Sequence, residues 1–182
     1  NYLTNTEHMD TDVSSRRLMG LFGQLLPDIA KALFPELPES EQLRIIDGCC
    51  QAEHEALLRK CAPLYPQLEE TLDTLSHRFP LFIVSNCQAG YIEVFLEYYH
   101  LGDLVADIEC YGNTQQQKDV NLKALIERNH YETYYYLGDT QGDYNACQKA
   151  GVPFLFAAYG FGTVDAQVPQ VESLEQLPEV MK

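Results

Sequence analysis

Short apolar runs separated by amphipathic helices occupy the chain after Pro80, and this alternation restricts the fold more than any other feature. Runs that are apolar almost throughout are typical of strands in a parallel sheet covered by helices on both faces. The pattern therefore predicts an α/β fold with a doubly wound, Rossmann-like parallel sheet. We expect strands at residues 81–84, 104–110, 133–137 and 152–158, and helices at residues 91–100, 118–129, 143–150 and 171–181.

The segment before the first expected strand has a helical pattern instead. Apolar residues recur at steps of three and four between positions 18 and 33 and again between 43 and 58, and prolines separate these stretches. We therefore expect two units, which are a helical unit over residues 1–65 and the α/β core over residues 66–182.

The charge of the chain excludes two classes of partner. Twelve Lys and Arg stand against 27 Asp and Glu, so the formal net charge is −15. A chain this acidic is repelled by nucleic acids and by anionic membranes, and a phosphate group must be met by a local site or a metal. No apolar stretch approaches the ~20 residues that span a bilayer. The six cysteines form no C-x-x-C pairs and lack the spacing of a small disulfide framework. We expect a cytoplasmic protein that binds neither nucleic acid nor membranes, and the sequence leaves its oligomeric state open.

Polar residues follow the first expected strand and open a later helix. Ligands of open parallel sheets bind beyond the carboxyl ends of the strands, so these positions are the candidates for a site. Ser85 and Asn86 offer a hydroxyl and an expected helix start, whose backbone N–H groups suit an anion. Lys118 begins the helix expected at residues 118–129, where its amine is suited to neutralising a phosphoryl oxygen.

Two carboxylates, Asp139 and Asp143, follow the expected strand at residues 133–137. Acidic oxygens four residues apart on a glycine-bearing loop suit a hard divalent cation such as Mg²⁺. Because clustered carboxylates repel one another, we also expect Asn at both positions to leave the fold nearly unchanged.

Each of these features also has a simpler explanation. Ser85 is equally typical of a helix cap, Lys118 of a solvated surface lysine, and residues 138–143 of an ordinary turn from strand to helix. Their order along the chain and their common placement at one edge of the sheet favour a joint site.

That order resembles the haloacid dehalogenase superfamily of phosphotransferases. The motifs that carry the resemblance are Ile83-Val84-Ser85-Asn86, Lys118 with Asp119-Val120-Asn121, and Leu137-Gly138-Asp139-Thr140-Gln141-Gly142-Asp143. The resemblance implies a Mg²⁺-dependent phosphatase of a small phosphorylated metabolite. It also implies that the helical unit is similar to the cap of subfamilies like β-phosphoglucomutase and phosphoglycolate phosphatase.

The same resemblance implies a role for each candidate residue. Ser85 and Lys118 would be catalytic, with the Ser85 hydroxyl and the Asn86 amide holding the transferring phosphoryl group while Lys118 balances its charge. The carboxylates Asp139 and Asp143 would hold Mg²⁺.

The resemblance further implies an aspartate nucleophile, with a second aspartate two residues later as general acid, directly after a central first strand. Asp10-Thr11-Asp12 fits these letters, but no continuous apolar run precedes it, so we interpret it as a polar loop. We expect the first strand and the nucleophile to lie upstream of this sequence, which begins with Asn1 rather than Met. The alternative is a catalytically inactive phosphate- or protein-binding relative without the first motif.

Overall fold

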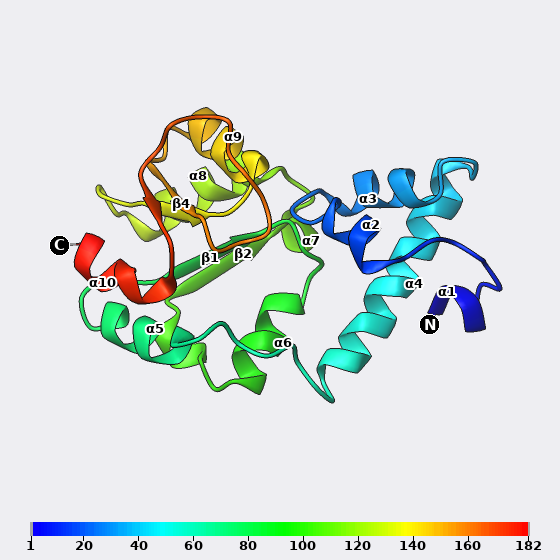
Figure 1. The fold of residues 1–182 in the computed structure, drawn as a ribbon, viewed down its shortest axis with the longest axis horizontal. Coiled ribbons are helices and arrows are strands. Elements are labelled where there is room, and N and C mark those ends of the chain that lie inside the picture. The colour runs from blue at the N-terminus through cyan, green and yellow to red at the C-terminus, as the bar shows by residue number, and fades with distance from the viewer. Residues whose placement is uncertain (1, 182) are drawn as a thin grey trace.

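Two parallel sheets form the centre of the protein. The computed structural model describes residues 2–181 and confirms the α/β fold with a parallel arrangement of strands (Figure 1). One sheet contains β1 (Phe82–Ser85) and β2 (Asp107–Cys110), and the other has the order β3 (Tyr136–Gly138), β4 (Phe154–Ala157) and β5 (Gln170–Val171). In the register, Ser85 is opposite Cys110 and Gly138 is opposite Phe156, so the carboxyl ends of paired strands are level.

Helices cover both faces of these sheets (Figure 1). On one face lie α8 (Lys118–Asn129) and α9 (Gln141–Ala150), which share a hydrophobic cluster with Val84 and Phe154. Two further clusters cover the other face and involve α5 (Leu68–Ser76), α6 (Tyr91–Tyr98) and α10 (Leu177–Val180). Apolar strands thus find partners above and below, as the sequence pattern requires.

The edges of β1 and β3 are not joined by a strand ladder within the described residues. A side chain links them instead: the Tyr136 hydroxyl donates to the backbone oxygen of Val84 over 3.1 Å. Unpaired strand edges carry backbone groups that need partners, so this break is a distinctive feature of the fold.

The N-terminal helices have a hydrophobic cluster of their own, built around Ala30, Phe34 and Ile45. These helices are α1 (Tyr2–Asn5), α2 (Ser15–Met19), α3 (Leu26–Leu33) and α4 (Glu39–Leu57). Residues 58–67 connect them to α5, and the division of the chain at residues 65 and 66 stays a prediction.

The C-terminal segment corrects one expectation, because residues 171–181 do not form a single helix. Val171 ends β5, a 3-10 turn follows at Leu174–Gln176, and only α10 is helical after it. Pro178 fixes the first turn of α10, where a missing N–H does no harm. Strand β2 also begins later than expected, because the 3-10 turn at Gly102–Leu104 precedes it, while α8 has its expected bounds.

Arg128 at the end of α8 holds the edge strand β2. Its guanidinium donates to Asp107 over 2.7 and 2.9 Å, to Glu109 over 2.6 Å and to the backbone oxygen of Ile108 over 2.7 Å. Glu109 is buried, so its carboxylate needs this partner. Two acidic residues on one face of an edge strand are thereby compatible with a helix packed over them.

We predict that Arg128→Met lowers the free energy of unfolding by about 2 kcal/mol. Breaking a buried pair costs ~3–5 kcal/mol, and the 40% exposure of the Arg128 side chain reduces that figure. Urea unfolding followed by circular dichroism measures the change. Arg59→Met is the matched control, because the Arg59–Glu55 pair is exposed on both sides and should matter little. An equal effect of both substitutions would contradict the assigned role of Arg128.

Candidate active site

An ion pair connects two of the predicted site residues. The Lys118 ammonium at the start of α8 donates to Asp143 Oδ1 in α9 over 2.5 Å. The two side chains are only 11% and 6% exposed. Lys118 is therefore not a solvated surface lysine, and the segments after β2 and β3 meet at this pair.

The second oxygen of Asp143 is also fully engaged. Asp143 Oδ2 accepts hydrogen bonds from the Asp139 amide (3.2 Å), the Thr140 amide (3.1 Å) and the Thr140 hydroxyl (2.7 Å), while the Asp143 amide donates to Thr140 Oγ1. Thr140 and Asp143 thus form a capping box at the start of α9. The expected repulsion between carboxylates does not describe Asp143, which is held by a cation and three hydrogen bonds.

Burial and charge act in opposite directions on the ion pair. Burial opposes ionisation of Asp143, but the Lys118 charge and the hydrogen bonds from Lys118 and Thr140 outweigh it and lower the pKa of Asp143. Burial likewise opposes the Lys118 ammonium, but the oxygens of Tyr136 and Asp143 prevail and raise the pKa of Lys118. Both groups are charged at neutral pH.

Tyr136 joins this pair, although its sequence pattern predicts only packing in a strand. Its hydroxyl accepts from Lys118 Nζ over 3.1 Å and donates to the Val84 backbone oxygen. Burial raises the pKa of Tyr136 to about 12, so the hydroxyl keeps its proton. A buried tyrosine hydroxyl needs a polar partner, and this requirement was the available signal for its role.

The segment after β1 does not begin with the helix that the sequence analysis predicted. Helix α6 begins at Tyr91 with Gly90 as its cap, so neither Ser85 nor Asn86 starts a helix. The Ser85 hydroxyl accepts from the Cys87 amide over 3.2 Å, and Asn86 Nδ2 donates to the backbone oxygen of Gly23 over 2.7 Å. Within residues 2–181, neither Ser85 nor Asn86 hydrogen bonds to Lys118, Asp139 or Asp143, and the link to Lys118 runs through Val84 and Tyr136.

Asp139 is oriented by the loop after β4. Its Oδ2 accepts from the Phe161 amide over 2.7 Å, whereas Oδ1 accepts no hydrogen bond from the described residues. A β-carbon at Gly162 would lie 2.6 Å from the Asp139 backbone oxygen, and one at Gly160 would overlap the Asp139 side chain. Glycine at both positions therefore permits this close packing.

The family model of haloacid dehalogenase-like hydrolases matches residues 1–157. The chain belongs to this family. The match spans the helical unit and the strands whose ends carry all five predicted site residues, so the resemblance stated from the motifs is confirmed.

Solved structures show the same fold at low sequence identity. A haloacid dehalogenase-like hydrolase from Bacteroides fragilis has a TM-score of 0.83 at 19% identity, covering 94% of this chain and 86% of that one. A predicted phosphatase from Clostridium acetobutylicum has a TM-score of 0.82 at 17% identity, with 99% and 87% covered. A predicted phosphoglycolate phosphatase from Haemophilus somnus has a TM-score of 0.80 at 17% identity, with 97% and 86% covered. No functionally curated protein matches the sequence.

The side chains of this haloacid dehalogenase-like hydrolase fit a magnesium ion in part. Asp139 keeps one carboxylate oxygen without a partner among the described residues, whereas both oxygens of Asp143 are occupied. Within residues 2–181, no three His, Cys, Asp or Glu side chains gather as a metal site. Mg²⁺ is commonly held by one or two carboxylates with phosphate oxygens and water, so Asp139 fits as one ligand of an incomplete set.

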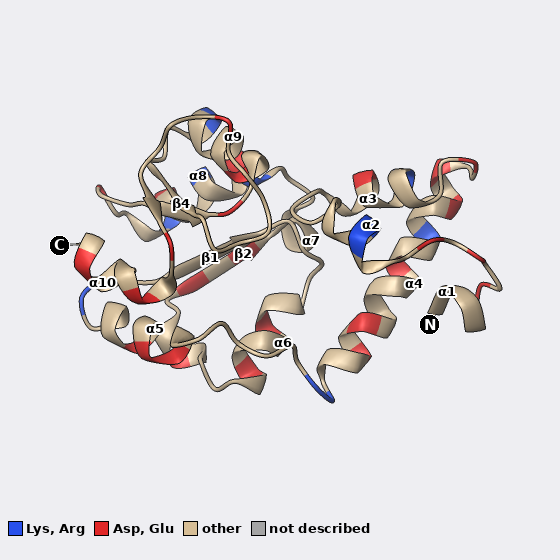
Figure 2. Ribbon diagram, viewed as in Figure 1, with Lys and Arg blue, Asp and Glu red and all other residues tan. Residues whose placement is uncertain are grey.

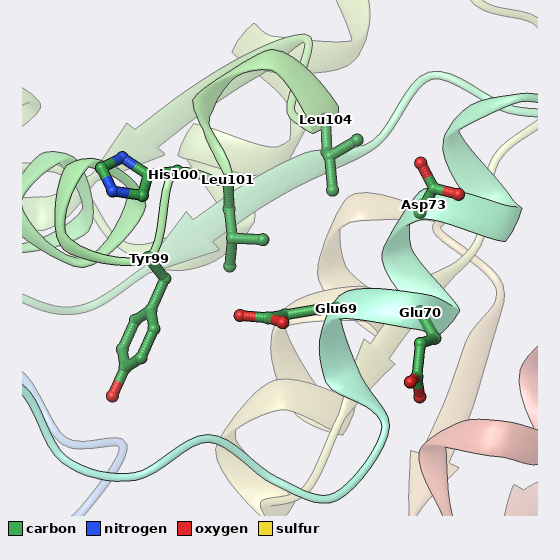
Figure 3. Close-up of a pocket in the computed structure, with 7 residues that line it drawn as sticks. All are labelled: Glu69, Glu70, Asp73, Tyr99, His100, Leu101 and Leu104. Carbon is green, nitrogen blue, oxygen red and sulfur yellow. The ribbon is translucent and has the colours of Figure 1, made fainter.

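Acidic residues are common on helices away from the candidate site. Figure 2 shows Asp and Glu along α4, α5 and α6, with basic residues few and scattered. An open pocket of about 380 Å³ near α5 contains none of the predicted residues, and Glu69, Glu70 and Asp73 line it (Figure 3). Its carboxylates would repel a phosphate.

Among the described residues, no helix is long and apolar enough to cross a membrane.

We predict that Asp143→Asn destabilises the fold by ~3–5 kcal/mol at pH 7, because it leaves the buried Lys118 charge unpaired. The pKa of Asp143 is lowered, so its stabilising ionisation is complete above pH ~4 and is lost as the pH falls through that lowered pKa. The difference between wild type and variant should therefore shrink in acid. Urea unfolding at several pH values measures it, and a difference independent of pH would contradict the ion-pair assignment.

Proposed function

We propose that this hydrolase is a Mg²⁺-dependent phosphatase that cleaves the phosphate monoester of a small metabolite through an aspartyl-phosphate. The observation that supports this most directly is the buried Lys118–Asp143 pair at the carboxyl ends of the strands, with Asp139 four residues before Asp143. A buried cation at this edge of an otherwise acidic protein is suited to a phosphate.

Lys118 would act by electrostatics. Phosphoryl transfer depends mainly on alignment and charge neutralisation, because little covalent chemistry falls to side chains other than the nucleophile. The raised pKa of Lys118 keeps its ammonium charged, and the bonds to Tyr136 and Asp143 fix its position before substrate arrives. The Ser85 hydroxyl and the Asn86 amide, at the end of β1, would bind phosphoryl oxygens.

Asp139 would hold Mg²⁺ through the oxygen that the Phe161 amide leaves free. When bound, the ion would supply charge neutralisation on the phosphoryl oxygens. Asp143 contributes to the same region through Lys118 and the start of α9, which is a different role from the direct ligation predicted for it. Its place in the metal site stays a prediction.

The nucleophile would come from outside residues 1–182. Asp10 and Asp12 lie in a loop between α1 and α2 and follow no strand of either sheet. Within residues 2–181, the facing edges of β1 and β3 share no strand ladder and are linked only through side chains such as Tyr136, so an additional strand of the same protein would find unpaired backbone groups on both. An aspartate at the end of such a strand would stand beside Ser85, Lys118 and Asp139.

The proposed reaction consumes water as its only co-substrate. The aspartate attacks phosphorus, the bond from phosphorus to the ester oxygen breaks, and a general acid gives that oxygen a proton. Water then attacks the phosphorus of the aspartyl-phosphate and returns a proton to the general acid, the bond from phosphorus to the carboxylate oxygen breaks, and inorganic phosphate leaves. The helices α1–α4 would form a cap over the site, because the loop between α2 and α3 reaches Asn86.

We predict that Lys118→Ala lowers turnover by ~10²-fold or more, as expected for the loss of one preorganised electrostatic partner. Hydrolysis of p-nitrophenyl phosphate by the protein made from its complete coding sequence measures the rate, below the melting temperature of each variant. Lys123→Ala is the matched control, because Lys123 is exposed on the same helix. A loss of less than twofold for Lys118→Ala would remove Lys118 from the proposed chemistry.

A second prediction concerns the nucleophile. Residues 1–182 alone should not hydrolyse p-nitrophenyl phosphate, whereas the protein made from its complete coding sequence should do so with Mg²⁺. Asp10→Asn in the longer protein should have little effect, because Asp10 is exposed and lies in a loop between α1 and α2 that follows no strand. Activity of residues 1–182 that Asp10→Asn abolishes would assign the nucleophile to Asp10. Phosphate binding without turnover in the longer protein would favour the inactive-relative alternative.

A further inference from the structure

The loop at residues 20–25, between α2 and α3, contacts the core through an aromatic pair. The rings of Phe22 and Phe161 meet edge to face, with centroids 5.2 Å apart and planes at 75°. Both side chains are substantially exposed, at 49% and 58%. Two exposed aromatic rings that meet across two chain segments form a contact that can open without disturbing a buried core.

Phe161 is also hydrogen-bonded to Asp139, the candidate metal ligand. Its amide donates to Asp139 Oδ2 over 2.7 Å, and glycines on both sides let its backbone pack directly on Asp139. Phe161 therefore contacts the loop at residues 20–25 through its ring and the candidate metal ligand Asp139 through its backbone.

Two more contacts place this loop over the site. The Gly23 backbone oxygen accepts from Asn86 Nδ2 over 2.7 Å. Gly23 has a φ of +82°, and a β-carbon on it would lie 3.2 Å from Thr140 Cγ2. The loop thus touches residues that follow β1, β3 and β4, where the predicted phosphate and metal ligands are.

We propose that Phe161 is a positioning residue that couples the loop at residues 20–25 to the orientation of the Asp139 carboxylate. With the ring held by Phe22, the Phe161 amide binds Oδ2 and leaves Oδ1 free for the ion. With the ring released, the backbone of residues 160–162 is less restrained and the carboxylate loses its fixed donor. This inference rests on the proposed function, since it takes Asp139 as a ligand of Mg²⁺.

Coupling between two sites is reciprocal. If the aromatic contact favours Mg²⁺ binding, Mg²⁺ must favour the contact by the same factor. An edge-to-face pair limits the factor to between about twofold and about tenfold, which corresponds to ~0.5–1.4 kcal/mol. Phe161→Ala and Phe22→Ala should therefore weaken Mg²⁺ binding by similar factors within this range.

Residues 1–182 contain no tryptophan, so an introduced tryptophan can serve as a fluorescent probe of the contact. Phe22→Trp introduces an indole at the contact, the only one within residues 1–182, and its fluorescence reports whether the ring at position 161 covers it. We expect Mg²⁺ added with inorganic phosphate to shift this emission. The shift should disappear when Asp139→Asn or Phe161→Ala is added, and Tyr135→Ala should preserve it. Tyr135 is the matched control because its side chain is also 58% exposed and lies just before β3.

Each outcome decides a different point. A shift that survives Phe161→Ala would show that Phe161 does not carry the coupling. No shift in a protein whose turnover requires Mg²⁺ would overturn this inference and leave the proposed function intact. No shift together with turnover independent of Mg²⁺ would overturn the metal assignment, and the inference with it.

Discussion

A buried ammonium and a buried carboxylate are compatible with a stable fold only when they meet, and the core of this protein is arranged so that Lys118 and Asp143 do. Lys118 lies at the first position of α8 and Asp143 in the first turn of α9, and these helices pack side by side. Thr140 caps α9 and binds the same carboxylate. The charge pair, the helix start and the loop after β3 therefore form one unit.

Tyr136 links the two sheets at the point where, in the described part of the chain, no strand ladder joins them. Its hydroxyl lies between the Val84 backbone oxygen and the Lys118 ammonium, so it satisfies a strand edge and a buried cation together. A lone side chain is a poor substitute for a strand, which would pair several backbone groups along both edges. The additional strand proposed between β1 and β3 would end beside Lys118.

Sequence patterns predicted the parts of this structure that depend on local periodicity. The apolar runs indicated β1 to β4, and α8 has the bounds expected from its pattern. The prediction of a single helix over residues 171–181 was wrong, because Val171 pairs with Ala157 in the sheet. Local periodicity does not reveal such a pairing between distant segments. The motifs named Lys118 and Asp143, which the structure brings into contact, yet the further partners of Asp143 and the hydroxyl contacts of Tyr136 depend on packing between helices and strands. Periodicity carries no information on such contacts.

The acidity of the protein determines how any phosphate must be recognised. With a net charge of −15, the long-range field opposes the approach of an anion, so attraction has to arise at short range. Lys118 is poorly exposed and already neutralised by Asp143, which makes it a weak long-range attractant. Its value lies in a fixed position, because a charge that is already oriented needs no reorganisation when a phosphoryl group arrives. The neutral donors at the end of β1, and an ion on Asp139, would therefore have to supply most of the attraction.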